Sequence, residues 1–358
     1  MGYILFCSAI VVVFGSQGTT SVYLFQILTM KKILKKIFFA VFPILFITSL
    51  YACFDPFCIV HHYDYSSLKF LQMKKTFDIN QDYIKTEIFI KNFKDKYFDT
   101  YVFGNSKSLL LDSSHLQNLF SSPSYYNYAV NFENIYGIEK KLEYLDTNKK
   151  EIKNVLLGFD ADVLRRPKNS TGHLFRKHPI LTEETYFNFQ FLCYIDIYEI
   201  TFIKILSSEL KNRLFNLQSE TKLNIAHLDS NILTKKDSIY YSNKQLFYNR
   251  STEQQFSKPV IMPRNKIILS NIARILKKHN TNYYILIQPL YNQTKLSPSD
   301  MRELCTIFEK NRIYDFSGKN DITNDKYNYY ENAHYKKAIA NKILDSILLL
   351  SKVNSRNR

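Results

Sequence analysis

The chain is poor in the residues and spacings that build metal and redox sites. Only five cysteines occur among its 358 residues, and none of them forms a CxxC pair or a cluster of cysteine and histidine. Structural zinc is therefore not expected, because it needs several such ligands at short spacing. Cys53 and Cys58 flank an Asp-Pro turn and could pair outside the cytoplasm, but there is no disulfide framework. The sequence predicts no metal and no cofactor.

Other signatures are missing as well. Glycine is rare, with eight residues, and neither a P-loop nor a dinucleotide fingerprint is present. No sequence period recurs, so a repeat protein is excluded. The net charge of +16 would suit an anionic partner, but a bias toward Lys, Asn, Ile and Tyr from an AT-rich genome explains it more simply. Zinc-finger spacing, RRM signatures and basic heptads are lacking, so no nucleic-acid partner is expected.

Long hydrophobic runs are confined to the N-terminal region. Residues 3–14 are apolar but too few to cross a bilayer, which takes about 20 residues. The run 37–53 is adequate and follows a basic flank at 31–36. We predict that 30–53 is a signal anchor or transmembrane helix, left uncleaved rather than removed as a signal peptide. The basic flank stays cytoplasmic by the positive-inside rule, so the rest of the chain faces outward.

The remainder reads as an alternation of strands and helices. After 1–29, which is either an incorrectly chosen start or a short apolar prefix, and the anchor, 54–98 is interpreted as a stalk with the first helices. Strands are expected at 101–103, 154–157, 283–287 and 313–317, with helices at 109–120, 138–147, 266–279, 299–309 and 335–350. Residues 165–262 read as a mostly helical insertion. The pattern predicts an α/β domain over 99–358, a parallel sheet with flanking helices.

Chemistry-bearing residues follow these predicted strands. The strand at 101–103 runs into a Gly-Asn-Ser turn that ends at Ser106, and His334 precedes the last helix. The carboxyl ends of parallel strands share one edge, where open sheets hold their active sites. Serine needs a base and the base needs an orienting group, so Ser106 is the candidate nucleophile, His334 the base and Glu331 the orienting carboxylate.

These motifs resemble those of the SGNH (GDSL-type) hydrolases. The Phe-Gly-Asn-Ser block at 103–106 is similar to the first block of that superfamily, and 314–335, with Glu331 and His334, is similar to its last block. Asp-Pro-Phe at 55–57 resembles the opening of membrane-anchored members, such as the D-alanine transfer protein of teichoic acids and the alginate O-acetylation proteins. The resemblance covers 55–358, apart from 165–262, and it implies a three-layer, flavodoxin-like arrangement of the sheet and its helices.

The sequence departs from the family pattern at two points. Glu331 stands where the family has Asp, and the third block, Gly-x-Asn-Asp, is missing. Gly158-Phe159-Asp160 is its nearest equivalent in order along the chain. The resemblance therefore assigns oxyanion or substrate binding to Asn105, Gly158 and Asp160.

The resemblance implies a membrane-anchored serine esterase or O-acyltransferase that acts on a surface polysaccharide through an acyl-enzyme. It implies a bacterial cell membrane protein with a periplasmic or extracellular domain, partnered by a membrane-bound O-acyltransferase. The alternative is a non-catalytic envelope scaffold that binds such a transferase or a polysaccharide assembly complex. The two differ in geometry: the enzyme requires Ser106 and His334 within hydrogen-bond reach, whereas a scaffold does not.

Overall fold

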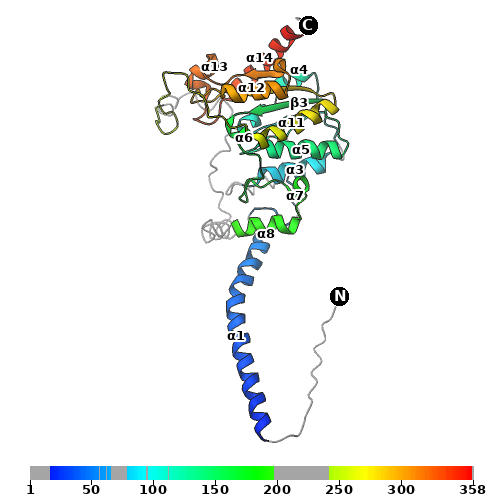
Figure 1. The fold of residues 1–358 in the computed structure, drawn as a ribbon, viewed down its shortest axis with the longest axis vertical. Helices are drawn as coiled ribbons and strands as arrows, with labels where there is room; N and C mark the ends of the chain where they lie inside the picture. The colour runs from blue at the N-terminus through cyan, green and yellow to red at the C-terminus, as the bar shows by residue number, and fades with distance from the viewer. Residues whose placement is uncertain are drawn as a thin grey trace. The chain divides into compact units, whose positions relative to one another are not determined.

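A computed structural model describes residues 17–55, 57–61, 63–65, 79–93, 96–111, 113–196 and 242–356. The chain divides into two compact units, 1–55 and 56–358 (Figure 1). In chain order the elements are α1 (Gln17–Phe54), α3 (Gln81–Asn92), β1 (Thr100–Phe103), η1 (Ser106–Leu110), α4 (Ser114–Phe120), β2 (Tyr125–Asn127), α5 (Ile135–Thr147), β3 (Asn154–Phe159), α6 (Ala161–Arg165), α7 (Pro179–Thr182), α8 (Tyr186–Asp196), α11 (Pro263–Lys278), β4 (Asn282–Ile287), α12 (Pro298–Ile307), η5 (Lys310–Arg312), β5 (Ile313–Asp315), α13 (Asp321–Asn324), η6 (Lys326–Asn328) and α14 (Lys337–Arg356).

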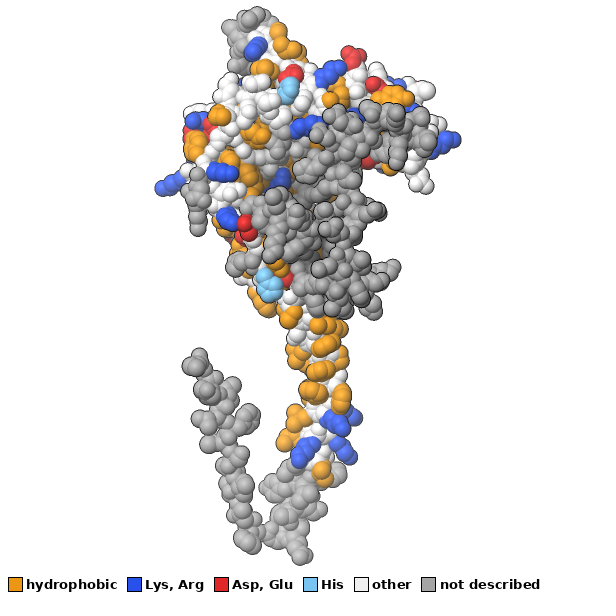
Figure 2. Space-filling view, turned by 180° about the vertical axis from the view of Figure 1, so that it is seen from behind, with side chains coloured by type: hydrophobic (Ala, Val, Ile, Leu, Met, Phe, Trp, Pro, Cys, Tyr) orange, Lys and Arg blue, Asp and Glu red, His pale blue; other side chains and the backbone are white. Residues whose placement is uncertain are grey.

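The first unit contains the apolar helix α1. Its stretch Leu28–Cys53 is long and apolar enough to cross a membrane, by length and composition. Figure 2 shows Lys and Arg side chains gathered toward one end of this helix and hydrophobic side chains along the rest. Pro43 lies inside the helix. The predicted apolar helix is thus present, and helical structure begins earlier in the chain than the basic flank.

The second unit is built on a five-stranded parallel sheet in the order β2-β1-β3-β4-β5. The predicted α/β class with a parallel sheet is confirmed. Strand order reverses between β1 and β3, because β2 lies on one side of β1 while β3, β4 and β5 follow on the other. Such a reversal leaves a crevice at the carboxyl ends of the two central strands, where ligands of open α/β sheets bind.

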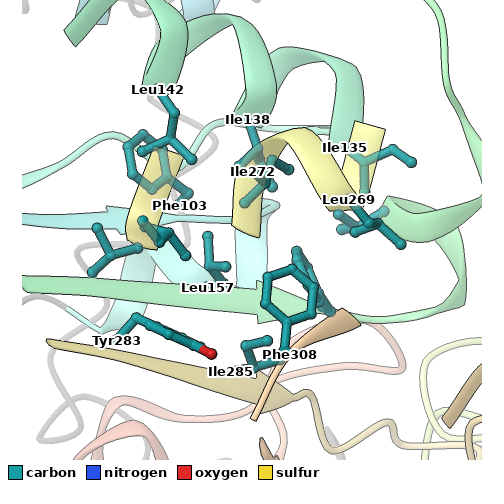
Figure 3. Packing of buried hydrophobic residues seen from close by; sticks show 14 of the residues in the cluster. Phe103, Ile135, Ile138, Leu142, Leu157, Leu269, Ile272, Tyr283, Ile285 and Phe308 are labelled. Atoms are coloured by element: carbon teal, nitrogen blue, oxygen red, sulfur yellow. The ribbon is translucent and has the colours of Figure 1, made fainter. Parts of the chain in front are cut away.

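The central strands are buried on both faces, which explains their near-continuous apolar sequences. Alternate residues belong to two hydrophobic clusters: Phe103 and Leu157 pack with helices α5 and α11 (Figure 3), whereas Val102 and Leu156 pack with α4 and α14. Phe89 of α3 joins the first cluster. Helices therefore cover both faces and fix where the strand ends lie.

Two local predictions differ from the structure. The expected helix at 109–120 is divided into η1 and α4, because Ser113 adopts an extended N-cap conformation (φ −164°) and starts a new helix. The short edge strand β2 was not predicted. It pairs Tyr125 and Tyr126 with Thr100 and Tyr101, and three residues are too few to show an alternating pattern.

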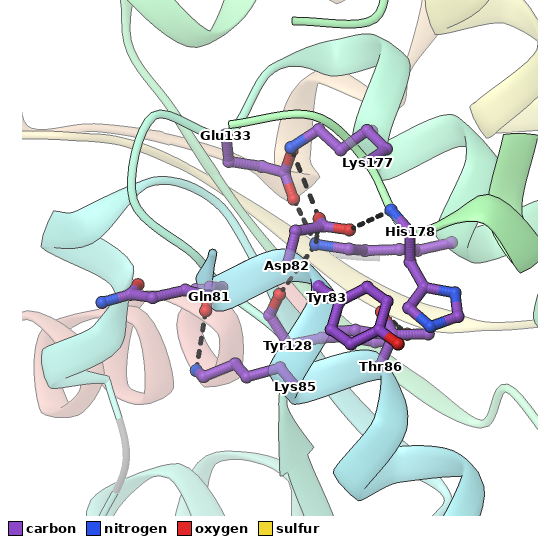
Figure 4. Close-up of polar contacts among 12 residues, drawn as sticks. Gln81, Asp82, Tyr83, Lys85, Thr86, Tyr128, Glu133, Lys177 and His178 are labelled. Carbon is purple, nitrogen blue, oxygen red and sulfur yellow. Dashed lines mark hydrogen bonds and ion pairs between the residues drawn. The ribbon is translucent and has the colours of Figure 1, made fainter. Parts of the chain in front are cut away.

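A fully buried group of four charged side chains ties α3 to α5 and to the segment before α7 (Figure 4). We call Asp82, Glu133, Lys141 and Lys177 the buried ionic cluster. Lys141 Nζ lies 2.8 Å from Asp82 Oδ2 and also contacts Glu133, while Lys177 Nζ lies 2.5 Å from Glu133 Oε1. The two positive and two negative charges balance, which makes their burial tolerable.

Candidate active site

The turn after β1 presents Ser106 at the reversal point of the sheet. Gly104 has a φ of +150°, and a Cβ atom there would lie 2.2 Å from Ser108 Oγ. Only glycine suits such a conformation and such close packing. Asn105 then caps η1, its side chain accepting a hydrogen bond from the Lys107 backbone N–H at 3.2 Å. Ser106 is the first residue of η1, so its position is fixed from both sides.

The loop before α14 brings His334 to this turn. Tyr329 and Tyr335 form an antiparallel bridge, and the Tyr330 backbone N–H donates to the His334 carbonyl oxygen at 2.9 Å. The His334 Nε2 atom lies 2.7 Å from Ser106 Oγ, although 228 residues separate the two in the chain. The structure therefore places the predicted nucleophile and the predicted base within direct hydrogen-bond distance.

Glu331 completes the hydrogen-bonded chain. One of its carboxylate oxygens, Oε1, contacts His334 Nδ1, and the other accepts from the Ala333 backbone N–H at 2.9 Å. Burial acts to raise the pKa of Glu331, but the hydrogen bond and charge of His334 outweigh it and lower the pKa below its ordinary value. The carboxylate is thus ionised at neutral pH. With Nδ1–H donating to Glu331, the Nε2 atom is free to accept the Ser106 proton.

The three side chains of this hydrogen-bonded chain are partly exposed. The side chains of His334 and Glu331 are 25% and 16% exposed, and Ser106 has intermediate exposure. A nucleophile in a sealed core could not meet a substrate from outside the protein. Partial exposure at the sheet edge leaves Ser106 and His334 accessible.

Asp160 holds the nucleophile turn to the end of β3. Its Oδ2 accepts from Asn105 Nδ2 at 2.7 Å and from Lys107 Nζ at 3.0 Å, while Oδ1 caps α6 by accepting from the backbone N–H groups of Asp162 at 3.0 Å and Val163 at 2.9 Å. Burial acts to raise the pKa of Asp160, but Lys107 and these hydrogen bonds lower it overall. An ionised carboxylate accepts hydrogen bonds only, so in this arrangement it fastens the turn.

The other two residues assigned to oxyanion or substrate binding lie in the same region. Asn105 directs its amide N–H₂ at Asp160. Gly158 packs against the turn, since a Cβ on it would lie 2.1 Å from Ser108 Oγ. All six predicted site residues therefore surround one turn at the β1 and β3 ends, and the binding roles of Asn105, Gly158 and Asp160 stay predictions.

Sequence reasoning missed a second polar group beneath the turn. Gln288, directly after β4, donates from Nε2 to Ser108 Oγ at 2.7 Å. The Tyr335 hydroxyl lies 2.9 Å from Gln288 Oε1 and 3.1 Å from the Lys107 carbonyl oxygen. Burial raises the pKa of Tyr335 far above its ordinary value, so it keeps its proton and donates. The position of Gln288 at a strand end was the available signal.

Metal chemistry has no candidate site within the part of the chain that the structure describes. There, no group of three or more His, Cys, Asp or Glu residues could hold an ion. Lys107, the residue after Ser106, brings a positive charge to the turn, and its side chain is 12% exposed. The side chains of the hydrogen-bonded chain at the turn offer a hydroxyl, an imidazole and a carboxylate.

No protein-family model matches this chain, and no curated protein matches it either. The likeness to SGNH hydrolases therefore depends on the short motifs around Ser106 and His334 and on the place of these residues in the chain. Function has to follow from the chemistry of the site.

Proposed function

We propose that this protein is a membrane-anchored serine acyl-ester hydrolase or O-acyltransferase of the SGNH type. The observation that carries the proposal is the hydrogen-bonded chain from Ser106 through His334 to Glu331. It stands at the point where ligands of open parallel sheets bind. Helices on both faces of the sheet support the three-layer SGNH arrangement, which is part of the proposal.

The three side chains can carry out acyl transfer with balanced proton movements. His334 Nε2 takes the Ser106 proton while Oγ forms a bond to the acyl carbonyl carbon. The tetrahedral intermediate then expels the alcohol or thiol of the donor, which receives the proton from Nε2. Water or an acceptor hydroxyl next gives a proton to Nε2 and attacks the acyl-enzyme, and Ser106 regains its proton as the product leaves. Glu331 stabilises the imidazolium at both steps.

We infer transfer to a surface polysaccharide rather than release to water. The helix at 28–53 is apolar enough to hold the domain beside a membrane, where an acyl donor delivered by an integral O-acyltransferase would be within reach. By the positive-inside rule, the lysines at 31–36 keep the N-terminal side in the cytoplasm and the domain outside. The cell envelope of a bacterium is the compartment that fits this proposal.

The test is covalent labelling of the full chain with a fluorophosphonate probe, with the adduct mapped by mass spectrometry. Wild type is expected to carry the adduct on Ser106, and Ser106→Ala and His334→Ala are expected to remove it. The matched control is His115→Ala. His115 Nδ1 also pairs with a carboxylate, at 2.7 Å from Asp345 Oδ1, but it belongs to α4 rather than to the proposed triad.

The control separates loss of the base from a general effect of removing a paired histidine. His115→Ala is expected to label like wild type. A folded wild type that takes no probe would refute the enzyme and leave the scaffold. An adduct on Ser106 that survives His334→Ala would refute the proposed role of the histidine.

A further inference from the structure

Helix α8 has two unlike faces. On one, Phe189 and Cys193 are fully buried, and the Phe189 ring stacks on Tyr83 of α3 with centroids 5.3 Å apart. On the other, Phe187 is 77% exposed and Phe191 48% exposed. Their rings stack on each other at 6.2 Å, with 7° between the ring planes. One face thus fixes the helix to the domain and the opposite face offers aromatic surface to the outside.

Ile195 continues this exposed surface one turn further and is 43% exposed. Residues 187, 191 and 195 are spaced by four, so they form one stripe along the helix. We call Phe187, Phe191 and Ile195 the α8 aromatic face. Exposed apolar residues grouped in this way mark a surface for a partner or a membrane.

The covalent chain limits how far this face can be from the membrane helix. Gln190, between the two phenylalanines, donates from Nε2 to the Ile59 carbonyl oxygen at 2.9 Å. Ile59 is the fifth residue after Phe54, where α1 ends. Five residues span at most about 18 Å when fully extended. The headgroup layer adds about 5–8 Å to each side of the hydrocarbon core.

The chain just after α1 packs against the domain. Phe57 is 3% exposed and Ile59 is 2% exposed, and the Phe57 ring lies 4.1 Å from that of His173. A chain that packs this soon after the end of a membrane helix has little length left for a spacer. The chain length therefore allows the domain surface around Ile59, which includes α8, to reach the bilayer surface.

We propose that the α8 aromatic face lies in the headgroup region of the membrane and orients the domain on the lipid surface. Interfacial helices bury an apolar face about 5–10 Å into the boundary between headgroups and acyl chains, and aromatic residues favour that boundary. The proposal rests on the membrane anchor of the proposed function but needs no catalysis. This contact would give the domain, and with it Ser106, a fixed orientation to the lipid surface. Without it, the domain could rotate freely about its anchor.

The chain contains no tryptophan, so one introduced tryptophan reports from a single site. Full-length Phe187→Trp and Phe191→Trp are reconstituted in nanodiscs made with ordinary or acyl-chain-brominated phosphatidylcholine. Bromine quenches tryptophan on contact. We expect about a twofold loss of emission in the brominated discs, because a residue at the depth of an interfacial helix meets the acyl chains.

The control is Leu349→Trp. Leu349 is likewise an exposed apolar residue on a helix, at 65% exposure, and it lies on α14, which Figure 1 shows at the other end of the compact unit from α8. Its emission should be the same in both lipids. Equal emission of the α8 reporters in the two lipids would overturn the proposal, as would failure of wild type to co-elute with the discs.

An aqueous quencher, acrylamide, then identifies the true environment in the overturned case. Accessible α8 reporters would mean open solvent, and shielded ones would mean a protein surface such as a second copy of this chain. Fluorophosphonate labelling is measured on the same samples. Labelling without lipid quenching refutes only the membrane contact, and lipid quenching without labelling refutes only the enzyme.

Discussion

Replacing Asp160 with asparagine should slow the chemistry of Ser106 and weaken the fold, while leaving the protein folded. The carboxylate accepts four hydrogen bonds, two from the side chains of Asn105 and Lys107 and two from backbone N–H groups of α6. Asparagine keeps the oxygen that caps α6 but sets an N–H₂ group against Asn105 Nδ2 and Lys107 Nζ, so donors face donors. The turn that carries Ser106 must shift to relieve this.

The size of both effects follows from the contacts. Losing two hydrogen bonds to a buried charge, offset by partial escape of the Lys107 ammonium to solvent, should cost about 2–4 kcal/mol of unfolding free energy. A displacement of the nucleophile by about 1 Å costs about 100-fold in rate. We therefore expect fluorophosphonate labelling of Asp160→Asn to be about 10- to 100-fold slower than that of wild type, with the protein still folded.

Asp300→Asn is the matched control. Asp300 is 1% exposed and also accepts from backbone N–H groups, those of Val260 at 3.0 Å and Ile261 at 2.9 Å, and among the described residues these hydrogen bonds lie outside the nucleophile turn. Urea unfolding should show destabilisation by about 1–2 kcal/mol. Labelling should stay within about twofold of wild type, because these hydrogen bonds stabilise the fold and do not position Ser106. Equal labelling rates for the two variants would refute the positioning role of Asp160.

Acid titration of stability gives a second readout on the same residue. The pKa of Asp160 is lowered in the folded protein, so its stabilising contribution is complete above the unfolded pKa of about 3.9 and is lost as the pH falls through the folded value. Asp160→Asn lacks this contribution at every pH. The difference in unfolding free energy between wild type and Asp160→Asn should therefore be constant near neutral pH and shrink below about pH 4.

Three further predictions concern the orienting carboxylate, the buried ionic cluster and the packing of Gly158. Glu331→Gln should slow labelling by about 100-fold or more with the fold intact, because an amide cannot stabilise the His334 imidazolium; a rate within threefold of wild type would exclude an orienting role. Glu133→Gln should lower the unfolding free energy measured in urea by about 3–5 kcal/mol, since it leaves the buried lysines short of a negative charge; a loss under 1 kcal/mol would show that the cluster is not balanced as described. Gly158→Ala should destabilise by about 1–3 kcal/mol through contact with the Ser108 hydroxyl and the Gln288 side-chain amide, and adding Ser108→Ala should recover part of that loss; no recovery in thermal unfolding would assign the strain to Gln288 and not to Ser108.

The parts of the fold that carry a strong repeating pattern were predictable. β3 and β4 are mostly runs of buried apolar residues that are followed by Asp160 and by Gln-Pro, and α5 and α11 carry one apolar stripe each. β2 was not predictable, since its three residues are all only partly buried. It exists because the edge of β1 needs backbone partners, which is a property of the sheet and not of the sequence at 125–127.

In the candidate site, too, local contacts could be predicted from the sequence and long-range contacts could not. The pair Glu331 and His334 is local, so spacing and position at a helix start were enough to propose it. Contacts such as Asn105 to Asp160 and Ser108 to Gln288 join residues 55 and 180 positions apart. They depend on β1, β3 and β4 being neighbours in register, and no single stretch of sequence contains that information.

Glu331 stands where the SGNH pattern that the chain resembles has aspartate, and the contacts of Glu331 show how the longer side chain reaches His334. Glutamate is one methylene longer than aspartate, so its carboxylate needs further contacts to hold it against the imidazole. The loop turns back on itself: the Ala333 backbone N–H donates to Glu331 Oε2 at 2.9 Å, which folds the side chain toward the helix start and directs Oε1 at His334 Nδ1. The bridge between Tyr329 and Tyr335 closes this loop, and with both carboxylate oxygens engaged the longer side chain has less freedom than an exposed glutamate would have. An aspartate is one methylene shorter and cannot place its oxygens where those of Glu331 lie, so Glu331→Asp should react with the fluorophosphonate probe more slowly than wild type.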